Sequence, residues 1–507
     1  MSHSHWNLQL SPAQHSVNAT GFPLLIAKLL GNRGLTETSQ VELFITADQR
    51  LSGDPFLLTD MHKAVTRIYR ALLSGENIAI YGDYDTDGIT GTAVLVQGLS
   101  NLGGKVTPYI PHRLTEGRGP KIAALENLYR QGVSLVITVD CGITSLNEVK
   151  KAKMMGLDII ITDHHIPPPI LPPALAVINP KLPNSNYYFS ELAGVGVAFK
   201  LLQALFQGIG KEQGLDELLD LIALGTVADM VPLLAENRYL VKQGLRLINT
   251  APRLGIREMI KQTGLSLGNI ESDSISWTLS PRLNTAGRLQ DAIASYKLLM
   301  TDSPQEAQKL VAWLEQKNTE RQRLMENGLA KARKQLFTQK NSPILLVGSN
   351  DYHGGIIGLI AGRLSEEFYR PTVVVKIGEK TSIASCRSIP EFNILLALNQ
   401  CHDLLTQFGG HAQAAGFTIL TSKLPLLKER LLKLATAQLV GVDLFPHLDI
   451  DVEVSLADLN LDTFQAIQQL APFGQGNPLP TFLSRAVKVT DYRTIGNGGE
   501  HLKLKLQ

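Results

Sequence analysis

Three aspartates spaced two residues apart, Asp83, Asp85 and Asp87, stand in the stretch YGDYDTDG at 81–88. Their mutual repulsion is unfavourable unless a cation lies among them, so the spacing indicates a metal site. One candidate is a calcium loop of the EF-hand type, which needs a glutamate at its twelfth position. Counted from Asp83 that position is Val94, and a strand pattern precedes the loop. The other candidate, the rim of a metallo-enzyme's sheet, is therefore favoured.

Acids and imidazoles follow further apolar runs. Asp140 ends SLVITVD, the DHH triplet at 163–165 ends LDIIITDHH, and Asp229 ends an apolar segment in LIALGTVADMVPL. Ligands of an open parallel sheet bind at the carboxyl ends of its strands, so we expect these residues at one edge, all at strand ends. Taken singly, they are ordinarily a solvated turn, structural histidines and a helix cap. Together and in this order they favour chemistry.

The donor types indicate which ions would bind. Carboxylate oxygens mixed with imidazole suit manganese, magnesium or zinc, and the absence of thiolate argues against a structural zinc site. Several carboxylates in one cleft would tolerate two divalent ions roughly 3.5 to 4 Å apart, which is the arrangement that cleaves phosphodiesters.

An α/β fold must position these residues. Short apolar, β-rich runs at 77–81, 134–140, 157–163 and 175–179 predict buried strands, and 145–156 predicts a helix between two of them, hence parallel strands. Residues 20–75 have the pattern of short helices. Residues 305–340 contain no proline and predict one long helix, either a solvated linker or a basic stripe that faces nucleic acid. A second α/β segment opens at 342–348, and from about 446 the pattern turns to strands and turns.

Composition bounds the class of protein. The 507 residues carry a formal charge of only +2, so any nucleic-acid footprint must be local. Three cysteines without a C-x-x-C pair fit a reducing cytosol. The amino terminus lacks the pattern of a secretory signal, and no apolar run reaches the length of a membrane span. We expect a cytoplasmic protein with no membrane association.

The motifs resemble those of the DHH phosphoesterase family. GDYDTDG, TVDCGIT, TDHH and GTVADMVPL are similar to its motifs one to four. SPRLNTAGRL, DYHGGIIGLIAGRL, CRSIPEFN, FGGHAQAAG and PFGQGNPLPTF extend the similarity to the single-strand-specific 5′-to-3′ exonucleases of this family. The resemblance implies a parallel-sheet DHH domain, a smaller α/β DHH-associated (DHHA1) domain joined by a long helix, and a partial OB-fold β-barrel. The expected segments are a helical 1–75, the DHH domain at 76–235, a helical connector at 236–340, DHHA1 at 341–440 and an incomplete OB-fold at 446–507.

The resemblance also implies roles for individual residues. One or two Mn²⁺ or Mg²⁺ ions would be held by Asp83, Asp85, Asp87, Asp140, His164 and Asp229. Asp83, Asp140 and His165 would be catalytic, with metal-activated water attacking the terminal phosphodiester. His165 would bind a metal or donate a hydrogen bond to developing charge, two roles that stay open. The expected contacts to substrate and its 5′ end are Arg113, Arg282, Asn284, Arg288, His353, Ser385, Arg387 and His411, with helix entry as the alternative for His411.

Three departures from the family pattern stand out. EGRGP has Arg118 where these exonucleases usually carry tyrosine, which affects contacts to the first nucleotides. Cys386 replaces a usual glycine, and we expect it to crowd the 5′-end pocket. The similarity stops inside an alternating stretch, HLKLKLQ.

The predicted function is metal-dependent 5′-to-3′ degradation of single-stranded DNA in repair and recombination. Two alternatives remain: a DHH phosphodiesterase acting on short oligonucleotides or cyclic dinucleotides, and a non-catalytic single-strand-binding module. The resemblance implies a monomer that works beside a single-strand-binding protein and a helicase.

Overall fold

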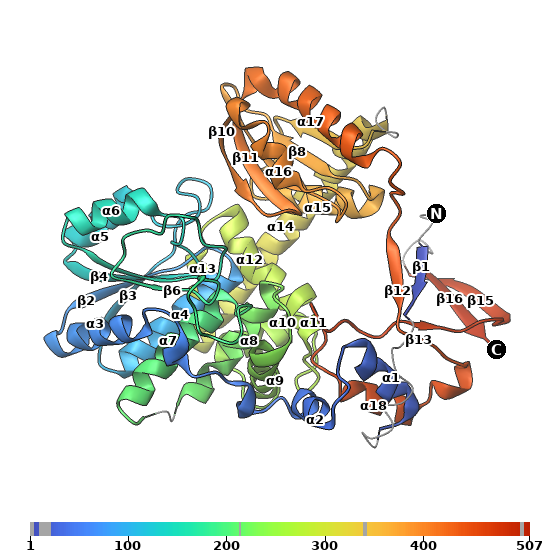
Figure 1. The fold of residues 1–507 in the computed structure, drawn as a ribbon, viewed down its shortest axis with the longest axis horizontal. Helices are drawn as coiled ribbons and strands as arrows, with labels where there is room; N and C mark the ends of the chain where they lie inside the picture. Colours follow the sequence, from blue (N-terminus) through green and yellow to red (C-terminus); the bar gives the residue numbers. More distant parts are fainter. Residues whose placement is uncertain (1–4, 10–21, 212–213, 338–341, 497–500) are drawn as a thin grey trace.

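The computed structural model describes residues 5–9, 22–211, 214–337, 342–496 and 501–507. Two α/β parts are joined by a helical connector, and a smaller C-terminal part lies beside the connector (Figure 1). Among the described residues, no helix combines the length and apolarity needed to cross a bilayer.

The first sheet is fully parallel. Its order is β3 (Lys105–Tyr109), β2 (Asn77–Tyr81), β4 (Val133–Val139), β5 (Asp158–Thr162) and β6 (Ala176–Ile178). The four predicted strands are confirmed to within a residue or two. Strand β3 was not predicted, because it is a partly exposed edge strand that contains a proline. The chain passes from β2 to one side and then returns to the other, so the topological switch point lies between β2 and β4.

Helices cover both faces of this sheet. On one face, α4 (Thr86–Asn101), α7 (Gly194–Gly208) and α8 (Leu219–Ala228) pack on Ile78, Ile80 and Ile137. On the other, α5 (Ile122–Arg130) and α6 (Leu146–Met154) pack on Ala79 and Val136. Alternate residues of each strand thus enter opposite cores, which explains the near-continuous apolar runs.

The connector is built around one long helix. Helices α9 (Ala235–Thr250), α10 (Leu254–Gln262), α12 (Ser280–Leu289) and α13 (Ile293–Met300) precede α14 (Pro304–Leu336). The first half of α14 buries Val311 and Leu314 in the core of the parallel-sheet part, and its second half buries Leu329 and Leu336 against the other α/β part. The long helix is confirmed, and it packs on both α/β parts while part of its surface stays exposed; the choice between a solvated linker and a stripe that faces nucleic acid stays a prediction.

The second sheet is mixed. Its order is β10 (Leu405–Gly410), β11 (Ala414–Leu420), β9 (Thr381–Arg387), β8 (Thr372–Lys376) and β7 (Leu345–Ser349), with only β7 and β8 parallel. Helix α15 (Ile357–Phe368) and the end of α14 cover one face. Helices α16 (Ile394–Asn399) and α17 (Leu424–Leu439) cover the other.

The C-terminal part recruits the N-terminal segment. Strand β1 (His5–Leu8) pairs in parallel with β12 (His447–Ile450), so the start of the expected helical segment contains a strand. Helices α1 (Leu24–Asn32) and α2 (Thr38–Thr46) share a core with β13 (Val452–Glu453) and α18 (Leu461–Gln468). Helix α18 corrects the expectation of only strands and turns after 446.

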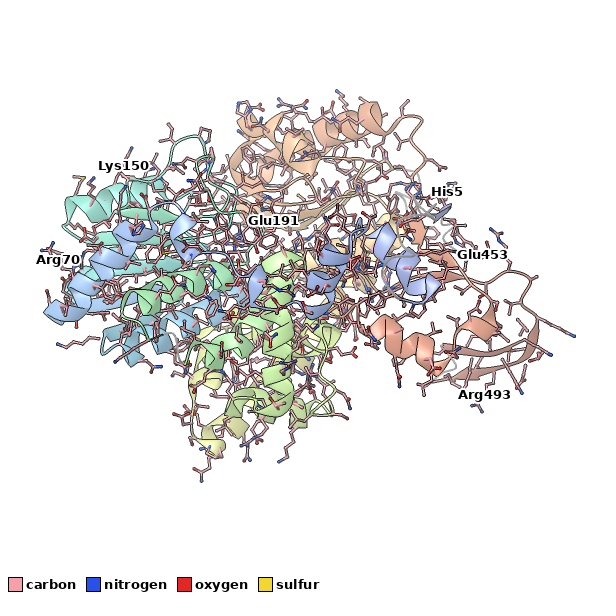
Figure 2. The ribbon with its side chains drawn as sticks, turned by 60° about the horizontal axis from the view of Figure 1, so that its bottom comes forward. His5, Arg70, Lys150, Glu191, Glu453 and Arg493 are labelled. Carbon is pink, nitrogen blue, oxygen red and sulfur yellow. The ribbon has the colours of Figure 1, made fainter. Side chains whose placement is uncertain are left out.

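The strands of this part form small sheets. β13 pairs with β14 (Phe482–Leu483), and β15 (Val489–Ile495) forms an exposed hairpin with β16 (His501–Leu506). Arg493 lies on this hairpin, at the far end of the molecule from Arg70 and Lys150 of the parallel-sheet part (Figure 2).

Candidate active site

Three adjacent strand ends deliver acids and imidazoles to one place. Asp83 follows β2, Asp140 follows β4 in a left-handed conformation with φ 58°, and residues 163–165 follow β5. Their ligand atoms form overlapping groups within 4.8 Å: Asp83, Asp85 and Asp140; Asp140, His164 and His165; Asp87, His164 and Asp229. The predicted metal ligands are therefore brought together. Asp229, however, ends helix α8 and not a strand, because α8 points its C-terminus at the sheet edge.

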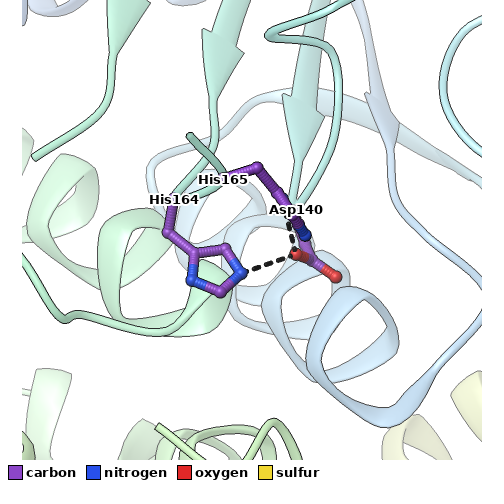
Figure 3. Close-up of side chains that lie close together, drawn as sticks. All are labelled: Asp140, His164 and His165. Carbon is purple, nitrogen blue, oxygen red and sulfur yellow. Dashed lines mark hydrogen bonds and ion pairs between the residues drawn. The ribbon is translucent and has the colours of Figure 1, made fainter. Parts of the chain in front are cut away.

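His164 lies at the centre of the carboxylates. Its Nε2 is 3.1 Å from Asp140 Oδ1, 3.5 Å from Asp229 Oδ2 and 3.9 Å from Asp87 Oδ2, with the first contact drawn in Figure 3. Burial, and then the neighbouring charge of His165, lowers the pKa of His164 to about 3. The ring is thus a neutral imidazole, which is the form that ligates metals.

The carboxylates are held by helix starts. Asp85 caps α4 by accepting from Gly88 N at 3.2 Å, and Asp87 accepts from Gly194 N at 2.7 Å and Val195 N at 2.8 Å at the start of α7. Burial and the charge of Asp85 nonetheless raise the pKa of Asp87 to about 7. Burial is also the largest cause that raises the pKa of Asp83 to about 6. Crowded, desolvated acids of this kind are stabilised by a cation.

The residues fit a divalent metal. Asp83 Oδ2, Asp140 Oδ2 and His164 Nδ1 are buried without a hydrogen-bond partner. Unsatisfied carboxylate oxygens in a buried group are costly unless an ion satisfies them. The oxygen-rich donor set with imidazole suits Mn²⁺ or Mg²⁺.

Asp163 orients the ring of His165. Its Nδ1 lies 2.6 Å from Asp163 Oδ1, and since a carboxylate only accepts, Nδ1 carries the proton. Asp163 stays ionised: although burial opposes it, the hydrogen bond and charge of His165 and other donors lower its pKa below the usual range. Asp163 was quoted in the sequence motif but not predicted as an orienting group. The other ring nitrogen, Nε2, does not bond to Asp163 and is therefore available to contact a ligand.

Arg288, Ser385 and Arg387 cluster at the junction of the two α/β parts, where the sequence predicts the 5′-end pocket. Arg288 Nη1 lies 3.4 Å from Gly355 O, just before α15, and a Cβ on Gly355 would lie 2.0 Å from Arg288 O. In the first turn of α15, a Cβ on Gly358 would lie 3.0 Å from Ser385 Oγ and 3.5 Å from Arg387 Nη2. The start of a twelve-residue helix is thus flanked by two guanidinium groups and a hydroxyl.

This cluster is positively charged and close to the predicted metal ligands. Burial lowers the pKa of Arg288 to about 9, and the next causes are the charges of Arg113 and Arg321, while Asp85 opposes them. Arg113 stacks at 4.9 Å over the ring of Tyr84, which lies between the first two metal aspartates. Such a cluster attracts a phosphate.

Cys386 does not crowd this pocket. Strand β9 alternates, so Ser385 and Arg387 face the pocket while Cys386 is buried in the core on the α16 and α17 side. The expectation from sequence was wrong because it ignored which face of the strand the residue occupies.

Two other predicted contacts are engaged within the protein. Arg282 donates to Glu315 at 2.6 and 3.2 Å and to Thr278 O at 2.8 Å. Asn284 Oδ1 accepts from Thr86 N at 2.8 Å and Oγ1 at 3.0 Å, so Asn284 braces the aspartate loop.

The two predicted histidines of the second α/β part lie in turns. His353 Nδ1 accepts from Gly355 N at 3.1 Å, beside the arginine pocket. His411 lies in the turn between β10 and β11, so its helix-entry alternative is wrong. Its ring stacks on that of His165 at 6.5 Å.

Two arginines at the site were not predicted from the sequence to belong to it. Arg321, on α14, is partly buried with its Nε unpartnered, and its charge reaches Arg288. Arg118 was noted only as a departure, yet its Nε lies 2.5 Å from Asp83 Oδ2. Neither position follows from local spacing, since both come from segments distant in sequence.

Comparison with known proteins agrees with this architecture. Residues 77–226 match the DHH family N-terminal domain, 341–439 the DHHA1 domain and 450–507 the RecJ OB domain. The crystal structure of RecJ from Thermus thermophilus in complex with Mn²⁺ superposes with a TM-score of 0.87 at 31% identity, covering 99% of this chain and 72% of that one. A second structure of that protein, in complex with Mg²⁺, gives 0.80 at 30% identity, covering 99% and 71%. Fold and site define a protein of the DHH phosphoesterase class.

The relatives found by sequence identify which family within this class the chain belongs to. The single-stranded-DNA-specific exonuclease RecJ of Bacillus subtilis is 39% identical over 100% of this chain, which spans 64% of that protein's length. The Escherichia coli protein of the same name is 33% identical over 96% of this chain and 87% of its own length. The chain therefore belongs to the RecJ family.

Proposed function

We propose that this protein is a metal-dependent exonuclease that removes 5′ mononucleotides from single-stranded DNA. The observation that carries the proposal is the adjacency of the carboxylate–histidine centre and the arginine pocket at the junction of the two α/β parts. A centre for hydrolysis beside a site for a terminal phosphate is what an end-directed nuclease needs. The names of its relatives support the same activity.

The chain's residues divide the work. Asp83, Asp85, Asp87, Asp140, His164 and Asp229 would hold the ions, since their ligand atoms lie in groups that could bind a metal. A divalent ion there supplies Lewis-acid activation of water and neutralises phosphate charge. The Nδ1 proton of His165 is engaged by Asp163. The ring would then present Nε2 to the scissile phosphate.

We assign recognition of the 5′ end to the pocket. Arg113, Arg288, Ser385 and Arg387 offer forked and hydroxyl donors to a terminal phosphate. His353 and His411 contact the adjoining nucleotides from the second α/β part. Arg282 and Asn284 act behind these contacts, because their polar atoms already bond to Glu315 and Thr86.

The test is a substrate panel in Mn²⁺: a 5′-labelled strand, a 3′-labelled strand, a blunt duplex and a dinucleotide. The proposal predicts that label leaves the 5′-labelled strand at once as a mononucleotide, that the 3′ label stays on shortening strands, and that the duplex resists. Cleavage of the dinucleotide alone would contradict it and favour a small-substrate phosphodiesterase. Binding of the strand without cleavage in Mn²⁺ or Mg²⁺ would favour a binding module.

The cellular setting is part of the proposal. We infer a cytoplasmic monomer that acts in DNA repair and recombination beside a single-strand-binding protein and a helicase, and family membership supports this setting. Affinity capture of those two partners by the purified chain tests it, and failure to retain either would count against it.

A further inference from the structure

The loop between β3 and α5 inserts a cation into the metal centre. Arg118 Nε lies 2.5 Å from Asp83 Oδ2, and its Nη2 lies 3.5 Å from Asp140 Oδ2. Asp83 and Asp140 are fully buried, whereas the Arg118 side chain keeps 45% of its surface exposed. The guanidinium thus approaches the acids from the open side of the site.

The ion pair is close but poorly aligned. Asp83 Oδ2 and Asp140 Oδ2, the atoms that Arg118 contacts, remain without a hydrogen bond. Burial lowers the pKa of Arg118, but the carboxylates of Asp83 and Asp140 outweigh burial and raise it. Arg118 therefore neutralises these acids electrostatically but leaves their oxygens without hydrogen bonds. A bidentate arginine–carboxylate pair would satisfy them.

The same carboxylates belong to the three-acid group of Asp83, Asp85 and Asp140. A divalent ion among them would lie within a few ångströms of the guanidinium, and the two cations would repel each other strongly in a site this buried. The divalent ion and the guanidinium therefore cannot both occupy this position.

The backbone around Arg118 permits movement. Gly117 and Gly119 flank it with φ of 75° and 74°, and a Cβ on Gly117 would meet no atom within 4 Å. Glycine adopts many backbone conformations, and no atom packs against Gly117, so the loop can change conformation at little steric cost.

We propose that Arg118 is an internal counter-cation that competes with a divalent ion for Asp83 and Asp140, so that metal enters this position only as the guanidinium withdraws. The inference rests on the metal site of the proposed function. It makes Arg118 a residue that sets the metal concentration at which this chain becomes active.

The test is calorimetric titration of Mn²⁺ into the chain and into Arg118→Gln, which keeps a polar side chain of similar length without charge. The expected result is a Kd for Mn²⁺ roughly tenfold tighter in Arg118→Gln. The matched control is Arg130→Gln, an exposed arginine at the end of α5 that pairs with Glu126, which is not one of the predicted metal ligands. Its Kd should equal that of the parent, and Arg118→Lys, which keeps the charge, should stay close to the parent.

Thermal unfolding supplies the second readout. With a chelator present, Arg118→Gln should unfold at a lower temperature than the parent, and added Mn²⁺ should raise its midpoint by more. An unchanged or weaker Kd in Arg118→Gln, with the parent binding Mn²⁺, would overturn the inference and leave the metal site standing. If neither protein binds Mn²⁺, both the inference and the metal site of the proposed function fail.

Discussion

The rings of His165 and His411 stack across the junction of the two α/β parts, with centroids 6.5 Å apart and an interplanar angle of 14°. His165 belongs to the edge of the parallel sheet, and His411 to the β10–β11 turn of the second sheet. The charge of His165, after burial, contributes to a lowered pKa of His411. The second α/β part therefore forms one wall of the candidate metal centre, and residues of both parts lie at the candidate active site.

Metal affinity should depend on pH between about 6 and about 7. A divalent ion needs the ionised carboxylates, whereas burial raises the pKa of Asp83 to about 6 and that of Asp87 to about 7. Protons therefore compete with the ion below these values, and affinity for Mn²⁺ should rise as pH increases through them. Calorimetric Kd values across this range check the prediction, and a Kd independent of pH would contradict it.

Gly194→Ala should weaken metal binding. A Cβ at this position would lie 2.6 Å from Asp140 Cβ and 2.8 Å from Asp87 Oδ2, so the two acids must move apart. We expect a Kd for Mn²⁺ weaker by roughly tenfold, since misplaced ligands lose ion affinity. Gly196→Ala is the matched control on the same helix, because its Cβ would meet Leu192 only at 3.4 Å. Equal affinity in both variants would contradict the packing argument.

Arg387→Gln should reduce selectivity for a 5′-phosphate. Arg387 lies beside Ser385 on β9, next to the start of α15, and loss of a charge-assisted hydrogen bond costs on the order of 2 kcal/mol. The ratio of kcat/KM for 5′-phosphorylated over 5′-hydroxyl strands should fall by roughly tenfold or more. Arg333→Gln, which removes a surface ion pair with Glu367, is the control. A ratio unchanged by Arg387→Gln would remove this residue from the 5′-end pocket.

Arg238→Met should destabilise the protein through the C-terminal part. The buried guanidinium donates to the carbonyls of Phe44, Leu470, Ala471 and Pro472 and lies 3.7 Å from the centre of the Phe44 ring. Leaving these acceptors unpaired costs on the order of 3 kcal/mol. Denaturant unfolding should show this loss, while Arg246→Met, exposed on the same helix, should change little. A loss no greater than that of the control would contradict a structural role for Arg238.

The features that depend on residues close together in sequence were predicted, namely the buried strands and the acids that follow them. The acids after β2, β4 and β5 were identified because a buried parallel strand is an apolar run whose end is marked by its first polar residue. Their convergence follows from parallel topology alone. Edge strand β3 and helix α18 escaped because they are half-exposed and short.

Long-range relationships were not predictable in this way. Asp229 was placed at a strand end because a fully buried helix such as α8 has the same apolar run as a strand. Arg118 and Arg321 reach the site from a loop and from the connector helix, and no spacing along the chain indicates what they contact. Cys386 was expected to obstruct the pocket because the sequence does not show which face of β9 it occupies.

Under the proposed function, Asp140 and its neighbours would hold the ions that activate water for hydrolysis of the 5′-terminal phosphodiester. The most direct measurement is the single-turnover rate of mononucleotide release from a 5′-phosphorylated single strand in Mn²⁺ for the parent, Asp140→Asn and the exposed Asp462→Asn. We predict a rate roughly a thousandfold lower in Asp140→Asn, with thermal stability retained and Asp462→Asn equal to the parent. Release from Asp140→Asn at the parental rate would mean that this carboxylate centre does not carry out the hydrolysis.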